Sequence, residues 1–168
     1  NYHAQSYHKN DYGIVFSKEN TTTEIKFYSS NIVRIIKYPI GKPSEKNSLS
    51  VIKKEEKSKF SVSENKNILS LKTDDLNILI DAKNGTITYK SASGKELLKE
   101  VGSDFQPFND AGNQTYSVSQ SFQLEKDEPI YGLGILQNGK MSQRNTNVKM
   151  IQNNTWDFVP FFQSVKGY

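Results

Sequence analysis

The sequence predicts an all-β protein, folded as an antiparallel β-sandwich with little helix. Apolar and polar residues alternate with a period of two in several segments, as they do on strands with one buried face. Turn-forming residues separate these segments at short intervals. Sustained apolar spacing of three and four residues is missing, and a parallel sheet would need helical crossovers with that spacing. We expect about ten or more strands in a single domain.

The first half of the chain contains two strand patterns and a loop. Ile25 and Phe27 alternate with more polar neighbours, which predicts a half-exposed strand. The run Ile32 to Tyr38 is apolar at both alternating positions, which predicts a central strand covered on both faces. Gly41 to Ser50 is predicted to be a loop. Lysines and glutamates alternate from Ser50 to Asn67, which predicts a solvated sheet edge or loop.

The middle of the chain is predicted to form a meander of hairpins. Leu76, Ile78, Ile80 and Ala82 share one face of a strand. Asn84-Gly85 follows, and this pair suits a tight type I′ turn with both central residues at positive φ. Ser93-Gly94 is a second turn signal before the next strand.

Two later segments are also predicted to be strands. The most regular alternation in the chain runs from Thr115 to Leu124, where serine, threonine and glutamine occupy one face. The final segment, DFVPFFQSVKGY, is aromatic and strand-like up to Tyr168 and indicates a domain cut from a longer protein.

Composition excludes several classes of protein. The net charge is only +4, and Arg34 and Arg144 are the only arginines, so we expect no nucleic-acid partner. No apolar run approaches the roughly 20 residues of a membrane-spanning helix. The absence of cysteine excludes disulfides and a thiolate nucleophile. The sequence begins at Asn1 rather than Met, so we expect that a segment was removed, either by signal processing or by the choice of the expressed segment, and the sequence does not say which. The location is left open, with a periplasmic or secreted one favoured over a cytoplasmic one.

The segment YGLGILQNGK, from Tyr131 to Lys140, contains three glycines but does not match a nucleotide-binding loop. Gly132 and Gly134 are followed by Gly139 rather than by a glycine three positions on, and no amphipathic helix follows. We interpret these glycines as positions where a strand bends or where another backbone approaches closely.

A family resemblance rests on two segments in the same order and at the same spacing as in the family. EPIYGLG, from Glu128 to Gly134, and NNTWDFVPFFQSVKGY, from Asn153 to Tyr168, resemble the N-terminal β-sandwich of glycoside hydrolase family 31. That family contains retaining α-glucosidases and α-xylosidases, and its sandwich is of the galactose mutarotase-like type. Ile135 stands where most members have glutamate. The resemblance implies a single sandwich domain over residues 1–168, followed in the full-length enzyme by a (β/α)₈ catalytic barrel.

The resemblance also implies that this chain has no catalytic residues and uses no cofactor. Both catalytic aspartates of the family lie on the barrel, and retaining enzymes need two carboxyl groups about 5 Å apart. The pairs Asp74-Asp75 and Asp127-Glu128 are adjacent in sequence, so on a strand their side chains point to opposite faces, and we interpret them as solvated turn residues. The expected partners are the catalytic barrel of the same full-length chain and an α-linked oligosaccharide substrate.

A loop of the sandwich lines the substrate entrance in family members. By position the matching loop is Gln152 to Asp157. The resemblance implies that Asn154, Thr155 and Asp157 hydrogen-bond sugar hydroxyls and that Trp156 stacks on a sugar face. The alternative is that Trp156 is a core or interface aromatic and that the asparagines form a turn.

Other functions remain as alternatives. A free-standing carbohydrate-binding module would bind sugar without a partner domain. Aldose epimerases resemble one another in using histidines within the sheet, whereas the only histidines here, His3 and His8, lie in the N-terminal segment. The same two histidines form at most a weak metal site. If the domain packs on a barrel, we expect an uncovered apolar face near Phe158, Phe161 and Phe162.

Overall fold

The computed structural model describes residues 7–43, 48–57 and 59–168. It divides into two compact units, one ending at Phe122 and the other beginning at Gln123. Twelve strands and no helix are present in the described residues, and the sheet pairings are antiparallel. The prediction of an all-β antiparallel sandwich is therefore confirmed.

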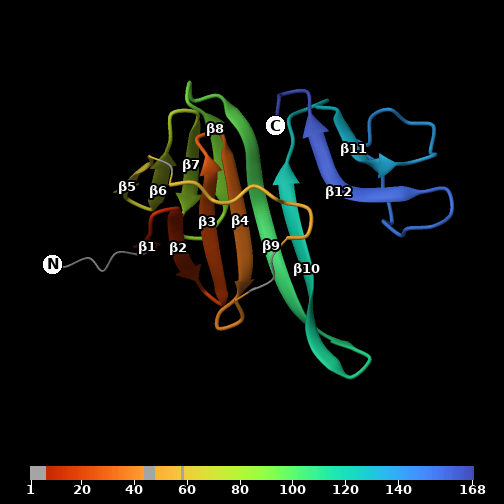
Figure 1. Cartoon of the computed structure of the whole chain (residues 1–168), viewed down its shortest axis with the longest axis horizontal. Coiled ribbons are helices and arrows are strands. Elements are labelled where there is room, and N and C mark those ends of the chain that lie inside the picture. The colour runs from red at the N-terminus through yellow and green to blue at the C-terminus, as the bar shows by residue number, and fades with distance from the viewer. Residues whose placement is uncertain (1–6, 44–47, 58) are drawn as a thin grey trace. The chain divides into compact units, whose positions relative to one another are not determined.

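The first sheet of the larger unit has four strands, in the order β1-β2-β3-β4 (Figure 1). The strands are β1 (Tyr7–Lys9), β2 (Gly13–Lys18), β3 (Thr21–Ser29) and β4 (Ile32–Pro39). Ile25 and Phe27 on β3 are fully buried, whereas β4 is an edge strand with half-buried residues. The relative burial predicted for these two strands was therefore wrong. A continuous apolar run indicates that both faces of a strand are partly covered. It does not indicate whether the strand has a hydrogen-bonded neighbour on one side or on both.

The second sheet has six strands, in the order β10-β9-β8-β7-β6-β5. The strands are β5 (Ser61–Asn65), β6 (Ile68–Lys72), β7 (Leu76–Asp81), β8 (Ile87–Ser91), β9 (Glu96–Asp110) and β10 (Asn113–Gln123). The meander and the long strand over Thr115 to Leu124 are confirmed, although Leu124 lies just beyond β10. Figure 1 shows β9 and β10 as a long hairpin.

The hydrophobic core lies between these two sheets. Side chains from both contribute to a single buried cluster, and the alternating residues of β7 reach it, as the period of two predicts. The cluster consists of Ile14, Phe16, Ile25, Phe27, Leu69, Leu71, Ile78, Ile80 and Ile87. This face-to-face packing makes the larger unit a β-sandwich.

The turn between β7 and β8 differs from the predicted one. Gly85 has φ of +72°, but Asn84 is not among the residues with positive φ, so the turn is not type I′. Instead, the Gly85 N–H donates to the Asp81 carbonyl at 2.7 Å, and Asn84 Oδ1 accepts from Thr86 N–H at 2.9 Å. The asparagine side chain thus caps a wider loop. The Ser93-Gly94 turn is confirmed, with φ of +87° at Gly94.

The lysine- and glutamate-rich segment from Ser50 to Asn67 follows the prediction where it is described. Its first part is an exposed loop, and its second part forms β5, which is the edge strand of the six-stranded sheet. Residues 44–47 of the predicted Gly41 to Ser50 loop lie outside the described residues, as does residue 58.

The smaller unit is built on β11 (Ile130–Ile135) and β12 (Asp157–Ser164), which form a two-stranded antiparallel sheet. The strand predicted up to Tyr168 ends at Ser164. There the chain turns, with φ of +88° at Gly167, and the Ser164 N–H donates to the Tyr168 carbonyl at 2.9 Å.

Candidate entrance loop on the smaller unit

The glycines of the YGLG segment allow β11 and β12 to approach closely. A Cβ atom at Gly132 would lie 2.6 Å from the Phe161 carbonyl oxygen, and one at Gly134 would lie 2.0 Å from the Asp157 carbonyl oxygen. Both residues have strongly positive φ, +106° and +96°. Their interpretation as close-approach positions is confirmed. Gly134 also fixes where β12 begins, at Asp157, the last residue of the predicted entrance loop.

Hydrogen bonds within the chain close the loop from Gln152 to Asp157. The Gln152 side-chain amide pairs with both backbone groups of Phe158: Nε2 donates to the carbonyl at 2.9 Å, and Oε1 accepts from N–H at 2.8 Å. Asn153 Oδ1 accepts from the N–H groups of Thr155 and Trp156, both at 3.2 Å. The asparagine turn, which the sequence offered as the alternative to sugar contact, is present, and the loop has a defined shape.

Trp156 is half-buried and packs against Phe158. The two ring centroids are 5.7 Å apart, and the ring planes make an angle of 61°. This is an edge-on arrangement that aromatic pairs prefer. Trp156 is therefore held against the sheet, while part of its surface stays open to solvent.

Three predicted sugar-contacting residues lie together on the exposed side of the loop. Asn154, Thr155 and Asp157 are exposed, and none of their side chains hydrogen-bonds within the described part of the chain. Their oxygen and nitrogen atoms are available to an external hydroxyl group. Asn154 to Asp157 are consecutive in the chain, so they are neighbours by sequence, and their contact with sugar stays a prediction.

The aromatic residues of β12 only partly match the expected uncovered face. Phe161 is 62% exposed, and Phe162 is half-buried. Phe158 is only 7% exposed, so its placement on an open face was wrong. Cover by Trp156 accounts for the burial of Phe158, and the pairing of β12 with β11 is irregular between Phe158 and Phe162, so a regular alternation does not apply there.

Glu128 is the buried acidic group of this unit, and sequence reasoning missed it. It is 4% exposed and accepts hydrogen bonds from the Ser164 hydroxyl, from the Tyr168 hydroxyl at 2.6 Å and from the Glu125 N–H at 2.9 Å. The interpretation of Asp127-Glu128 as solvated turn residues was therefore wrong for Glu128. The sequence signal that could have indicated burial of Glu128 is its position two residues before β11, the strand of the YGLG segment.

The environment of Glu128 stabilises its ionised form. Burial acts to raise the pKa of Glu128, but the hydrogen bonds from Ser164, Tyr168 and the Glu125 backbone outweigh it, together with the charge of Lys166. The pKa of Glu128 therefore lies below its ordinary value. Burial and the same carboxylate raise the pKa of Tyr168 to about 12. Glu128 thus links the start of β11 to the end of β12.

Comparisons with known proteins identify the family of this chain. Residues 22–168 match the family described as the glycosyl hydrolase 31 N-terminal galactose mutarotase-like domain. This chain belongs to that family. The α-xylosidase of Saccharolobus solfataricus is 32% identical over 159 residues, which are 89% of this chain and 22% of that protein.

Solved structures extend the comparison. A GH31 α-xylosidase from Xanthomonas citri superposes with a TM-score of 0.87 and 31% identity, over 94% of this chain and 18% of that chain. A GH31 α-xylosidase from a soil metagenome, complexed with xylose, has a TM-score of 0.81 at 18% identity, over 96% and 27%, and shows the shared fold. The present chain spans about a fifth of the length of the first two relatives.

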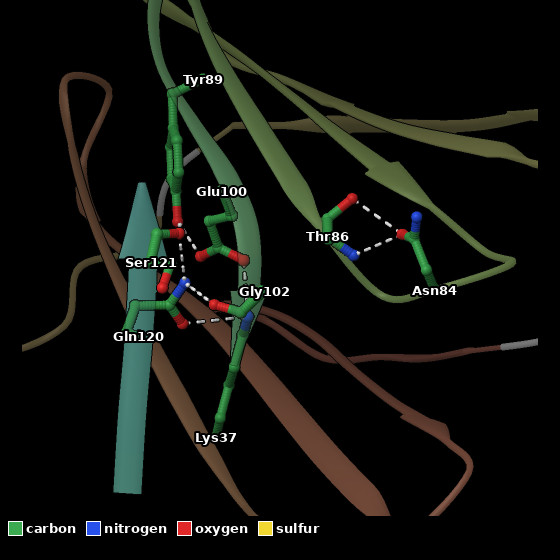
Figure 2. A network of polar contacts seen from close by, with 8 residues as sticks. All are labelled: Lys37, Asn84, Thr86, Tyr89, Glu100, Gly102, Gln120 and Ser121. Carbon is green, nitrogen blue, oxygen red and sulfur yellow. Dashed lines mark hydrogen bonds and ion pairs between the residues drawn. The ribbon is translucent and has the colours of Figure 1, made fainter. Parts of the chain in front are cut away.

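This GH31 N-terminal domain contains a second buried polar cluster, on the larger unit (Figure 2). Lys37 Nζ lies 2.5 Å from Glu100 Oε2, the Tyr89 hydroxyl donates to Glu100 Oε1 at 3.0 Å, and Lys37 also reaches Gln120 Oε1 at 3.4 Å. Burial and the Glu100 charge raise the pKa of Tyr89. The side chain of Glu100 is 3% exposed, and that of Lys37 is 10% exposed.

The ion pair borders a hollow of about 400 Å³, which is also lined by apolar residues of β4, β9 and β10. The charged groups satisfy one another, and no buried side-chain nitrogen or oxygen among the described residues lacks a partner. Lys37, Glu100 and Gln120 were not singled out from the sequence, because Lys37 on β4 lies 63 residues from Glu100 and 83 residues from Gln120.

The other acidic and histidine residues that the sequence singled out are exposed where the structure describes them. Asp74 and Asp75 are exposed in the bend before β7, as predicted. His3 lies outside the described residues, and His8 is exposed on β1. No group of three or more potential metal ligands occurs within residues 7–43, 48–57 and 59–168. The same described ranges contain no helix with the length and apolar character needed to cross a membrane.

Proposed function

We propose that this chain is the non-catalytic N-terminal domain of a retaining α-glycosidase, either an α-glucosidase or an α-xylosidase. In this proposal residues 1–168 form a single sandwich domain that precedes a (β/α)₈ barrel. Two findings support the proposal: the chain belongs to the GH31 N-terminal family, and the relatives that it matches are much longer proteins with α-xylosidase activity in their names.

The acidic residues of the smaller unit support a non-catalytic role. Retaining glycosidases use one carboxyl group as nucleophile and a second as acid and base, about 5 Å apart. Glu128 is buried and held by three donors, so its oxygens are not free to attack a sugar or to transfer a proton. Asp127, its sequence neighbour, is an exposed turn residue with φ of +61°.

The anchored loop is the observation that carries the substrate-entrance role. Its backbone is fixed at both ends, and Asn154, Thr155 and Asp157 present free polar side chains beside the partly exposed ring of Trp156. Sugar recognition uses the same combination of hydroxyl-binding groups and an aromatic surface. We assign this loop to the substrate entrance of the full-length enzyme, where it contacts an α-linked oligosaccharide.

The exposed apolar residues of β12 support a bracing role. Phe161 is 62% exposed and Val159 is 49% exposed, on a strand whose other residues include the buried Phe158. Exposed apolar side chains that cluster on one face are typical of a surface that packs against another domain. We assign this side of β12 to contact with the catalytic barrel.

Assays on the separated chain and on the full-length enzyme test the proposal. The separated chain is expected to hydrolyse neither aryl α-glucosides nor aryl α-xylosides and to show negligible heat of binding with oligosaccharides. Clear sugar affinity of the separated chain would instead support a carbohydrate-binding module. In the full-length enzyme, replacing Trp156 and Asp157 by alanine is expected to raise KM or lower kcat/KM. Unchanged kinetics would remove the loop from the substrate site.

A further inference from the structure

The side chain of Gln152 holds the entrance loop in place through contacts that no other residue duplicates. We propose that Gln152 is a positioning residue, which orients Trp156 and Asp157 toward the substrate without touching it. This inference rests on the proposed function of the loop. Its structural part, that Gln152 controls the position of Trp156, is independent of any substrate.

The pairing of Gln152 with Phe158 is bidentate. The amide donates to the Phe158 carbonyl at 2.9 Å and accepts from the Phe158 N–H at 2.8 Å. The side chain therefore occupies the place that a neighbouring strand would take along β12. Loss of the amide removes the partner of two backbone groups of Phe158, a residue that is 7% exposed when Gln152 is in place. Glutamate could accept from the N–H, but its carboxylate has no donor for the carbonyl.

The same contacts connect Gln152 to Trp156. The amide of Gln152 fixes the backbone of Phe158, whose ring packs edge-on against the Trp156 ring at 5.7 Å. From the other side, Asn153 Oδ1 holds the Trp156 N–H at 3.2 Å. Contacts within the segment from 152 to 158 therefore connect its first residue, its last residue and Trp156 to one another. When the amide is removed, Trp156 is held by the Asn153 turn and the ring contact, and its neighbour Asp157 stays paired with Ile135 of β11.

The only tryptophan of the chain lies in this loop, so its fluorescence reports the position of the loop directly. The variants are Gln152→Ala, which removes both contacts, and Gln152→Glu, which keeps the side-chain size but removes the donor. Gln137→Ala is the matched control, because Gln137 is exposed and its side chain makes no hydrogen bond within the described residues. Circular dichroism checks that each variant keeps its sheet content.

Both Gln152 variants are expected to shift the Trp156 emission to longer wavelength. Quenching of Trp156 by acrylamide is expected to rise by about twofold, because a released loop exposes its side chains to solvent. The control is expected to match the parent chain. Unchanged emission and quenching in Gln152→Ala would overturn the proposal, and so would a parent-like result for Gln152→Glu, since the donated hydrogen bond is then dispensable.

Kinetics of the full-length enzyme separate this inference from the proposed function. Gln152→Ala is expected to lower kcat/KM by about tenfold, mainly through KM, because a displaced positioning group weakens binding while the catalytic residues stay in place. A released Trp156 with unchanged kinetics would refute the entrance role and leave the positioning of the loop intact. Altered kinetics in Trp156→Ala, together with unchanged fluorescence and kinetics in Gln152→Ala, would refute the role of Gln152 alone.

Discussion

Replacement of Gly134 by alanine tests the close approach of β11 and β12. The added Cβ would lie 2.0 Å from the Asp157 carbonyl oxygen, whereas real Cβ contacts stay beyond 3.0 Å, so the strands must separate by about 1 Å. The backbone has φ of +96°, which costs an L-residue about 1–3 kcal/mol. Hydrogen bonds strained by the separation cost about 1 kcal/mol each. We expect a loss of about 3 kcal/mol or more in unfolding free energy.

Urea denaturation followed by Trp156 emission measures this loss, because the only tryptophan lies in the same unit. Gly139→Ala is the matched control: its φ is +70°, but nothing lies within 4 Å of the added Cβ. The control is expected to lose about 1–2 kcal/mol, from backbone strain alone. Gly132→Ala should fall between the two, because its Cβ would lie 2.6 Å from the Phe161 carbonyl oxygen.

The expected difference between Gly134→Ala and Gly139→Ala is about 2 kcal/mol, which lowers the urea midpoint by about 1 M at a typical slope. Equal midpoints for the two variants would refute the steric argument, because backbone strain alone would then account for both losses.

Two further predictions concern the buried acids. Glu128→Gln is expected to lose about 1–3 kcal/mol at neutral pH, because the neutral amide has one acceptor oxygen for three donors, so its NH₂ group must face either the Glu125 N–H or the Ser164 and Tyr168 hydroxyls. Since the pKa of Glu128 is lowered, its contribution to stability is complete above the ordinary value of 4.5 and disappears as the pH falls through the lowered value. The variant should therefore lose less stability on acidification than the parent chain. Glu100→Ala is expected to cost about 3 kcal/mol, because it removes the charged partner of the largely buried Lys37 and leaves it only the 3.4 Å contact with Gln120 Oε1.

Each of these predictions has its own control. Denaturation at neutral and at acidic pH compares Glu128→Gln with the parent, and equal losses on acidification would contradict the assigned role of the carboxylate. For the ion pair, the double variant Lys37→Met with Glu100→Leu should recover most of the stability lost in Glu100→Ala. A double variant as unstable as the single one would show that shape, rather than charge, makes this cluster important.

The strands could largely be predicted from the sequence, because the period of two is a local property of each segment. The alternation at Ile78 and Ile80 correctly identified residues that are now seen to be buried. The position of a strand within its sheet could not be predicted in this way. β4 is as apolar as a central strand but lies at an edge, since edge pairing depends on where other parts of the chain fold.

The candidate site was predictable where its parts are neighbours in sequence. Asn154 to Asp157 form one loop, so the resemblance could assign them together. The contacts of Glu128 with Ser164 and Tyr168, which are 36 and 40 residues away, could not be predicted, because sequence spacing says nothing about which residues meet across a sheet. The same reason explains why the pairing of Lys37 with Glu100 was missed.

The frame of the entrance loop and its tip are made by different residues. Gly134, Gln152 and Phe158 make the contacts that hold the loop, whereas Asn154 and Thr155 are exposed at its tip and, in the proposed entrance role, meet the substrate. Exchanging the two tip residues therefore leaves the supporting contacts untouched. The two tip residues are therefore suitable positions for substitutions that change what the loop binds, because such substitutions leave the contacts that fold the domain unchanged.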